Sequence, residues 1–403
     1  MILGFFATIL VVVAGVHFYL WLRLVRNTTR PGRARRVLTW TMAGLAVLVP
    51  VTFVASRTEG GHWVAWPGYM WVAIMFYLVV FLVVLEIPRF VAGRLLRDPA
   101  PVAVPVTVPE TPVEAPAPAP EPVPMTRRLL IGRTAALVAG AGALSTVGYG
   151  VRTALGDPVI EPVKVLLPKL DPRLNGLRFA VVSDIHLGPL TGIGHSERIV
   201  RMINELEADV VAIVGDLVDG SVAELGRLAK PLSRLESRYG SYFVTGNHEY
   251  YTANGPQEWI DELDSLGVRS LRNSRVEIRH GGAVLDLAGV NDVNGTEYDD
   301  GPDFEAALGG RAPGRSTVLL AHQPVQVRQA AQYGVDLQLS GHTHGGQMVP
   351  FNLVVPMQQP VVSGLEAVDG VQVYVTRGAG FWGPPVRVGA PPEITLLEIG
   401  AGG

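Results

Sequence analysis

Three long runs of apolar side chains dominate the first hundred residues, at positions 2–22, 37–55 and 66–85. Each is close to the length of roughly 20 residues that a helix needs to cross the hydrocarbon core of a bilayer. A fourth run, at positions 129–151, is weaker, because it is rich in Gly and Ala and carries Arg133 near its start. The pattern therefore predicts three membrane-spanning helices and a weaker fourth.

The pattern changes near residue 157. Beyond it, short runs of β-branched residues alternate with amphipathic stretches, which is typical of a soluble α/β domain. The segment between the third and fourth runs, DPAPVAVPVTVPETPVEAPAPAPEPVP, is so rich in proline that we expect an extended, solvated tether. We predict four parts: three transmembrane helices, a Pro-rich linker, a fourth helix with its connector, and a soluble domain, at residues 1–97, 98–124, 125–156 and 157–403.

Arginine placement predicts the orientation in the membrane. Arginines are dense after the first and third apolar runs, whereas the loop after the second run holds only Arg57. By the positive-inside rule, the two dense connections are cytoplasmic and the N-terminus lies outside. The segment MTRRLLIG resembles a twin-arginine export signal, but its place after three apolar runs favours the start of a fourth span. If the fourth run spans, the soluble domain lies outside, which we favour; if it does not, that domain is cytoplasmic.

Composition narrows the possible chemistry. The net charge of −3 gives no reason to expect nucleic acid as a partner. The chain has no cysteine, which excludes disulfides and thiolate metal sites. A metal site would use His, Asp, Glu or Asn, a set that favours hard or borderline divalent ions.

Five predicted strands of the soluble domain each end in polar side chains. The runs are LRFAVVSDIHLG, DVVAIVGDLVDG, GSYFVTGNHEY, STVLLAHQP and VDLQLSGHTHGG, and their polar residues are Asp184 and His186; Asp216 and Asp219; Asn247, His248 and Glu249; His322; and His342 and His344. Sites in α/β proteins form beyond the carboxyl ends of strands, so five strands in one sheet would bring these groups to one edge.

The spacing within these motifs suggests metal ligands. A single histidine at the end of a strand is usually an ordinary loop residue, but five such motifs in succession favour a site. Asp184 and His186 are two residues apart, as are His342 and His344, so each pair would point to one side of an extended segment. Asp216 lies between them and could bridge two ions. We also expect the glycines before Asp216, Asn247 and His342 to form sharp turns close to an ion.

The motifs DIH, GDLVD, GNHE, AH and GHTH, in this order, resemble those of the calcineurin-like metallophosphoesterase superfamily. The resemblance covers about residues 158–399 and is closest to the bacterial membrane-attached branch. It implies an α/β fold, a four-layer αββα sandwich preceded here by about four transmembrane helices. It also implies two divalent ions, drawn from Mn, Fe and Zn.

The resemblance further implies a role for each matched residue. The first ion would be bound by Asp184, His186, Asp216 and His344, and the second by Asp216, Asn247, His322 and His342. His248 would face the phosphate and assist the leaving group, and Asp219 would orient His248.

These observations predict a membrane-anchored dinuclear phosphoesterase. It would hydrolyse a phosphodiester or pyrophosphate, of a lipid or an envelope metabolite, by attack of a metal-bridging hydroxide. The alternatives are a phosphomonoesterase and a non-catalytic membrane scaffold that retains the fold. The expected partners are a phosphorylated small-molecule or lipid substrate and the membrane itself, without nucleic acid. We place the protein in the cell membrane as a multi-pass protein, with the catalytic domain outside the cytoplasm.

Several further residues have two interpretations. Asn291, Asp292 and Asn294 either line a substrate pocket or form an Asx-rich turn, and we favour the turn slightly. Arg377 and Arg387 either bind phosphate or, more commonly for arginines, serve the structure. Trp382 lies in the apolar stretch GAGFWGPPV and would form a rim beside the site that contacts lipid.

Overall fold

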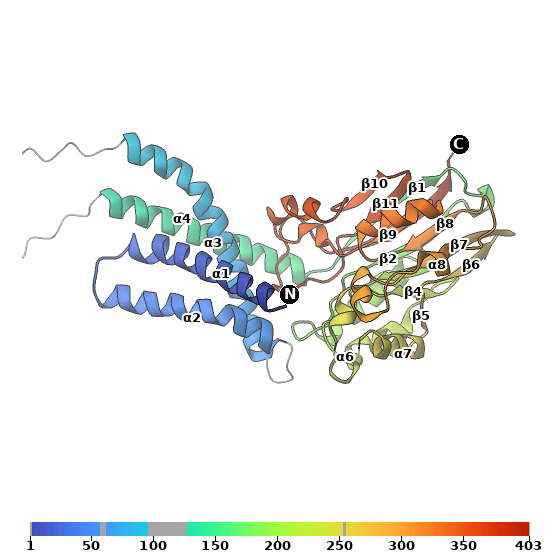
Figure 1. Cartoon of the computed structure of the whole chain (residues 1–403), viewed down its shortest axis with the longest axis horizontal. Helices are drawn as coiled ribbons and strands as arrows, with labels where there is room; N and C mark the ends of the chain where they lie inside the picture. Colours follow the sequence, from blue (N-terminus) through green and yellow to red (C-terminus); the bar gives the residue numbers. More distant parts are fainter. Residues whose placement is uncertain (1, 57–61, 96–126, 253–254, 403) are drawn as a thin grey trace, which may run out of the picture. The chain divides into compact units, whose positions relative to one another are not determined.

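The computed structural model describes residues 2–56, 62–95, 127–252 and 255–402 (Figure 1). The chain divides into two compact units, one made of Met1–Pro50 and Trp71–Thr146 and the other of Val51–Met70 and Val147–Gly403. The predicted Pro-rich linker lies outside the described residues.

All four apolar runs form helices. They are α1 (Ile2–Leu20), α2 (Arg33–Ala55), α3 (His62–Leu95) and α4 (Arg127–Leu155), and a π-helical segment (Trp21–Arg26) continues α1. Each is long and apolar enough to cross a membrane, including the fourth. The helices reach beyond the apolar runs: Arg33, Arg35 and Arg36, which the sequence placed in a loop, lie in the first turn of α2. That part of the prediction was wrong, because arginine is a good helix former and can extend its charged end towards water.

One polar residue of the first unit has a local structural role. His17 on α1 is buried, and the ring nitrogen Nε2 accepts a hydrogen bond from Trp71 Nε1 on α3 at 3.0 Å. The other nitrogen, Nδ1, lies 2.8 Å from the Val13 carbonyl oxygen. His17 therefore joins two neighbouring helices.

The second unit is built on two six-stranded mixed sheets. The first has the order β1 (Val159–Leu167), β12 (Glu393–Ala401), β2 (Leu177–Val182), β3 (Val210–Val214), β4 (Ser241–Val244), β5 (Val268–Ser270). The second has the order β10 (Gly364–Val368), β11 (Val371–Val375), β9 (Leu337–Ser340), β8 (Thr317–Leu320), β7 (Ala283–Gly289), β6 (Ser274–His280). The five strands that carry the polar motifs are thus divided between the sheets. The expectation from the strand pattern that they share one sheet was wrong, whereas the two sheets implied by the family resemblance are confirmed.

Side-chain alternation in the strands produces four layers. In β2, Phe179 and Val181 enter the core between the sheets, together with Leu285 and Leu339 of the second sheet. Ala180 and Val182 point the other way, into a core beneath helices of the outer face, α5 (Ile193–Glu205), α6 (Val222–Ala229) and α7 (Gln257–Ser265). The short helices α8 (Phe304–Leu308) and α9 (Val327–Ala330) cover the second sheet. Because both faces of each sheet are covered, a central strand such as β3, with the sequence VVAIV, is apolar throughout.

Candidate metal centre

The polar loops after β2, β3, β4, β8 and β9 meet at one edge of the two-sheet sandwich. Within the first sheet, the backbone N–H of His186 donates to the Asp216 carbonyl oxygen at 3.2 Å. Across the sheets, the backbone N–H of His342 donates to Asp184 Oδ2 at 3.0 Å. Together with the side-chain contacts described below, they bring close to one another all nine residues that the sequence assigned to metal binding or catalysis. These residues are Asp184, His186, Asp216, Asp219, Asn247, His248, His322, His342 and His344.

The backbone at several of these residues is left-handed. The φ angles are 51°, 48°, 52°, 70° and 52° at Asp184, His186, Asp216, His342 and His344. The expectation of extended segments was therefore wrong, although Asp184 and His186 do offer ligand atoms to the same group. A left-handed non-glycine residue costs of order 1–3 kcal/mol, and such residues cluster at functional sites because the surrounding structure holds them there.

Two glycines allow the close packing of these loops. A Cβ at Gly246 would lie 2.2 Å from Asp216 Oδ1, and one at Gly341 would lie 1.8 Å from Ser183 Oγ and 2.4 Å from Asp184 Oδ2. No side chain fits at either position, so the tight packing expected before Asn247 and His342 is confirmed, whereas the approach to an ion stays a prediction.

One group of donor atoms surrounds the space between Asp184 and His344. His344 Nε2 lies 3.2 Å from Asp184 Oδ1 and 3.1 Å from His186 Nε2. Asp216 Oδ2 lies 3.9 Å from the same His186 nitrogen. Ions held by bonds of about 2.0–2.2 Å place neighbouring ligand atoms at roughly these separations. Asp184, His186 and His344 thus form one buried group that could hold a divalent ion, and Asp216 lies beside it through its contact with His186.

A second group shares Asp216. Asp216 Oδ2 lies 3.2 Å from His322 Nε2, and His342 Nδ1 lies 2.9 Å from Asn247 Oδ1. Asp216, His322 and His342 also offer atoms within 4.8 Å of one another. Asp216 is therefore the carboxylate positioned between two groups, as a bridging ligand would be.

His322 provides the clearest test of whether a cation fits. Its Nδ1 lies 2.8 Å from the Val214 carbonyl oxygen, so this nitrogen carries the proton. In the neutral ring, the buried Nε2 presents a lone pair; it has no hydrogen-bond partner among the described residues and lies 3.2 Å from the Asp216 carboxylate. Burial lowers the pKa of His322, but the charge of Asp216 outweighs burial and raises this pKa well above its usual value. The site therefore attracts positive charge, as a divalent ion requires.

His248 and Asp219 form a pair beside these groups. His248 Nδ1 lies 2.7 Å from Asp219 Oδ1, and its Nε2 lies 4.0 Å from Asp216 Oδ2. Burial lowers the pKa of His248, but the charge of Asp216 and the hydrogen bond to Asp219 outweigh burial and raise it to about 9. His186, Asp216 and His248 also form a third group of potential metal donors. The assignment of His248 to phosphate rather than to an ion therefore stays a prediction.

The structure adds a contact that the sequence did not indicate. Asp219 Oδ1 also lies 2.7 Å from His186 Nδ1. One carboxylate thus fixes the rings of both His186 and His248. Carboxylates behind metal-ligating histidines fix the tautomer and raise the basicity of the ring.

Glu249 is a second contributor that sequence reasoning missed. Its fully buried carboxylate accepts hydrogen bonds from the backbone N–H groups of Asp216, Leu217 and Gly246, at 3.1, 2.8 and 2.7 Å. Burial and the charge of Asp216 raise the pKa of Glu249 to about 7. Through these hydrogen bonds, Glu249 fixes the backbone of the loop that carries Asp216. Its position directly after His248 was the available signal.

The other candidates fall into structural roles. Asp292 forms the favoured turn, since its Oδ1 accepts from the Asn294 N–H at 2.8 Å. Arg387 is fully buried and donates to the carbonyl oxygens of His344 and Arg377, at 3.0 and 2.8 Å. Arg377 pairs with Glu161 at 3.1 Å. The structural interpretation of both arginines is therefore the better one.

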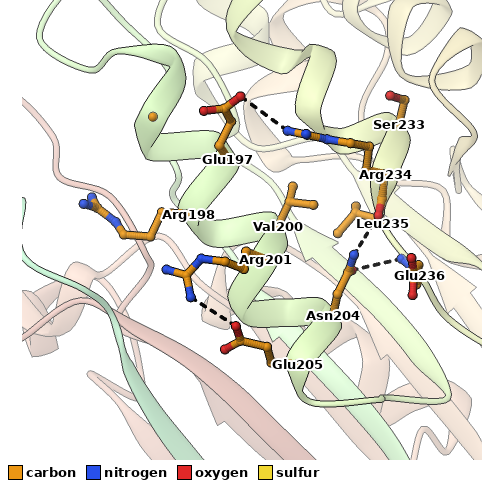
Figure 2. Close-up of a pocket in the computed structure, with 11 residues that line it drawn as sticks. Glu197, Arg198, Val200, Arg201, Asn204, Glu205, Ser233, Arg234, Leu235 and Glu236 are labelled. Carbon is orange, nitrogen blue, oxygen red and sulfur yellow. Dashed lines mark hydrogen bonds and ion pairs between the residues drawn. The ribbon is translucent and has the colours of Figure 1, made fainter.

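A broad hollow on the outer surface is a different feature. Figure 2 shows it between α5 and residues 233–236. The hollow has a volume of about 1060 Å³. Its charged side chains pair with one another, as Arg201 does with Glu205 and Arg234 with Glu197. None of the nine predicted site residues lines it, so we place the chemistry at the edge of the sheets.

The chain matches the family model described as calcineurin-like phosphoesterase over residues 177–346, a range that contains all nine predicted site residues. A protein of Danio rerio named "Transmembrane protein with metallophosphoesterase domain" is 42% identical over 260 residues, covering 62% of this chain and 59% of the relative. Its namesake in Bos taurus is 41% identical over 288 residues, covering 68% and 64%. The chain thus spans less than two thirds of the length of both.

A bacterial relative is matched over a larger share of its own length. An "Uncharacterized metallophosphoesterase" of Helicobacter pylori (strain ATCC 700392 / 26695) is 38% identical over 262 residues, which cover 64% of this chain and 68% of the relative. The fold, the converging donor atoms and these matches agree with the resemblance seen in the motifs. The chain belongs to the calcineurin-like metallophosphoesterase family.

Proposed function

We propose that the protein is a membrane-anchored dinuclear metallophosphoesterase that hydrolyses a phosphodiester or pyrophosphate bond. The observation that carries this proposal is the position of Asp216 between two groups of buried donors, with His248 beside both. A purely structural role does not explain why so many of the predicted ligand residues have a left-handed backbone. It also does not explain why the lone pairs of their nitrogen and oxygen atoms face one another at one edge of the sheets.

The proposed ligand sets follow from the two groups. Asp184, His186, Asp216 and His344 would hold one ion, and Asp216, Asn247, His322 and His342 the other. Their nitrogen and oxygen donors suit Mn, Fe or Zn. Two such ions, when bound, lower the pKa of water enough to supply hydroxide near neutral pH and neutralise the charge on phosphate.

The protein's own residues would orient the substrate and move the proton. His248 Nδ1 donates to Asp219, which leaves Nε2 directed towards the space beside Asp216. The charge of Asp216 and the hydrogen bond to Asp219 favour the protonated form of His248, which can give its Nε2 proton to the leaving oxygen. The hydrogen bond to Asp219 keeps the His248 ring in this orientation during the proton transfer.

Two arginine contacts support a diester or pyrophosphate over a monoester. A phosphomonoester carries a second negative charge at the phosphorus to be cleaved, which favours an additional cation at the site. Arg387 is committed to backbone carbonyl oxygens and Arg377 to Glu161 and Glu393. Neither is free to neutralise that charge.

The four helices support an outside location for the catalytic unit. α4 is one continuous helix of 29 residues, long enough to span. The second unit includes Val51–Met70, from the α2–α3 connection that the arginine pattern places outside, and there Tyr69 packs beside Gly383. A reporter fused at residue 160 tests this: activity of a reporter that works only in the cytoplasm would contradict it.

The function is tested with the full chain in detergent. The protein is stripped of metal with a chelator, restored with Mn, Fe or Zn, and assayed with a phosphodiester, a phosphomonoester and a lipid pyrophosphate. We expect metal-dependent hydrolysis that favours the diester or the pyrophosphate, and none from Asp216→Ala. Preference for the monoester would replace this proposal with a phosphomonoesterase, and no hydrolysis with any metal would favour a scaffold.

A further inference from the structure

An exposed apolar segment follows the metal loop directly. Residues 349–357, VPFNLVVPM, contain two 3-10 turns, η9 (Phe351–Leu353) and η10 (Val355–Met357). Their apolar side chains face outward: Leu353 is 74% and Met357 82% exposed, and Phe351 and Val354 are about half exposed. We call Val349–Met357, together with Trp382, the apolar rim. Grouped exposed apolar side chains on a folded domain mark an interaction surface.

The rim is also free of charge. No Asp, Glu, Lys or Arg occurs from residue 345 to residue 365, although charged residues make up 17% of the chain. The stretch 378–386 around Trp382 likewise has none. Trp382 is itself half exposed. A surface built to face water would carry charges at such positions, so the composition favours an apolar partner.

Contacts within the second unit connect the rim to the end of α4. The Val349 N–H donates to the Val388 carbonyl oxygen at 3.0 Å. One residue earlier, the Arg387 N–H donates to the carbonyl oxygen of Gly150 on α4, also at 3.0 Å. Gly150 lies five residues before the end of α4, or about 7.5 Å along the helix. The rim therefore continues from a segment that packs along the last turns of an apolar helix.

The chain connection restricts the same region. Only three residues separate the end of α4 at Leu155 from the start of β1 at Val159. Three residues reach at most about 10 Å, so the catalytic unit stays close to the end of that helix.

Tyr69, at the start of α3, packs beside Gly383, the neighbour of Trp382. Tyr and Trp are the residues enriched where a membrane meets water.

The rim is tied to the metal loop by one side chain. Gln347, three residues after His344, donates from Nε2 to the Trp382 carbonyl oxygen and accepts at Oε1 from the Trp382 N–H, both at 2.9 Å. Gln347 also carries the backbone from the metal loop into Val349. Both parts of the rim are thus held against the loop that carries His342 and His344.

We propose that the apolar rim inserts into the surface of the bilayer that α4 spans and delivers a membrane-resident phosphate to the metal centre. The substrate class would be an amphiphile whose apolar tail stays in the bilayer while its phosphate reaches His344 and His248. The contact with lipid rests on the rim alone, whereas the substrate class rests on the proposed phosphoesterase activity.

The absence of cysteine allows a direct test. The full chain carrying Met357→Cys is labelled with an environment-sensitive fluorophore and reconstituted in vesicles of phosphatidylcholine and phosphatidylglycerol. We expect a shift of the emission to shorter wavelength and quenching by doxyl-labelled lipids. Leu166→Cys is the matched control: this residue is 61% exposed, and β1 ends at the edge of the first sheet opposite the metal loops. Its label should show neither change.

Each outcome decides the proposal. A Met357→Cys label that behaves like the control overturns insertion into the bilayer, whatever the activity. A shifted emission without quenching by lipid also overturns it, since it indicates contact with protein, including a second copy of the chain. Quenching of the label at Met357 without hydrolysis of any phosphorylated lipid supports the lipid contact but overturns the proposed substrate class. Hydrolysis of a soluble diester is a separate measurement, and it shows whether the proposed phosphoesterase activity holds.

The double variant Leu353→Glu with Met357→Glu tests the substrate class. In the membrane-reconstituted full chain, we expect the ratio of lipid-ester to soluble-diester kcat/KM to fall, mainly through a higher KM for the lipid. Leu166→Glu should leave this ratio unchanged. An unchanged ratio in the double variant would contradict delivery through the rim.

Discussion

Replacing Asp219 with Asn tests how one carboxylate supports both metal binding and proton transfer. Asp219 Oδ1 lies 2.7 Å from Nδ1 of His186 and 2.7 Å from Nδ1 of His248. Burial raises the pKa of Asp219, but the charge of His186 and its hydrogen bond outweigh burial, so the net pKa lies well below the usual value. The carboxylate is therefore ionised. Asn preserves the shape and removes the charge.

The size of the effect follows from the hydrogen bonds. Bonds to charged groups contribute about 1.5–3 kcal/mol and neutral ones about 0.5–1.5 kcal/mol, so Asp219→Asn loses roughly 1 kcal/mol at each histidine. Since about 1.4 kcal/mol is a factor of ten, the loss at His186 should weaken its metal by roughly fivefold to tenfold. The loss at His248 should lower kcat by a similar factor. Each factor lies at the lower end of, or just below, the 10–100-fold range found for metal affinity or activity when a group behind a metal ligand is replaced.

The assay separates the two losses. Metal affinity of the full chain is measured by competition with a fluorescent chelator, and kcat is measured with a soluble diester at saturating metal. Asp209→Asn is the matched control, because Asp209 accepts a hydrogen bond from the Arg178 backbone N–H at 2.9 Å and lies before β3, at the opposite end of that strand from the metal loops. If Asp219→Asn matches the control in both measurements, the shared-carboxylate reasoning is refuted.

Four further outcomes are expected. His248→Ala should keep its metal content by elemental analysis and lose about 10²–10⁴-fold in kcat, because it removes a general acid; loss of metal would instead make His248 a ligand. Asp216→Ala should lose both ions, and full retention of both would refute a bridging role. Because the hydrogen bond to Asp219 raises the pKa of His248, activity that needs its proton should fall as pH rises through that pKa, and Asp219→Asn should move this limb to lower pH; a limb that stays in place in the variant would contradict the pairing. Burial, followed by the charge of Arg198, lowers the pKa of His195 from 6.5 to about 4, so its contribution to folding is present above pH 6.5 and is lost as pH falls towards 4. This loss amounts to about 3 kcal/mol at most, and denaturant unfolding of His195→Gln should show a smaller loss of stability over that range than the unsubstituted chain.

Hydrophobic length predicted the four helices, including the weak fourth run. Only the ends were misplaced, as with Arg33 at the start of α2. Apolar side chains report which residues would cross a bilayer, but they do not report where a helix stops. Flanking arginines continue the helix because their long side chains carry the charge away from the axis.

The convergence of the nine predicted site residues was predictable because each follows a strand within a short motif. The division of those strands between two sheets was not, since a strand buried on both faces is apolar throughout whichever sheet contains it. The left-handed backbone conformation at Asp184 and His344 could not be predicted from the sequence either. Such a conformation is imposed on a non-glycine residue by tertiary packing, and only the adjoining glycines signalled tight turns. For the same reason, the hydrogen bond between His186 and Asp219 could not be inferred from the spacing of these residues along the sequence.

The proposed anchoring by α4 bears on which substrate the site meets. With three residues between α4 and β1, the second unit remains at the end of an apolar helix, and a membrane-spanning α4 would confine it to a thin layer of solution. A soluble substrate gains nothing from such confinement, whereas a phosphate held in the same membrane meets the site at a raised effective concentration. Gln347 adds a structural reason, because it fastens Trp382 to the loop that supplies His342 and His344. A rim that served only as an anchor would need no bond to the metal loop; a rim that positions a lipid phosphate over that loop does.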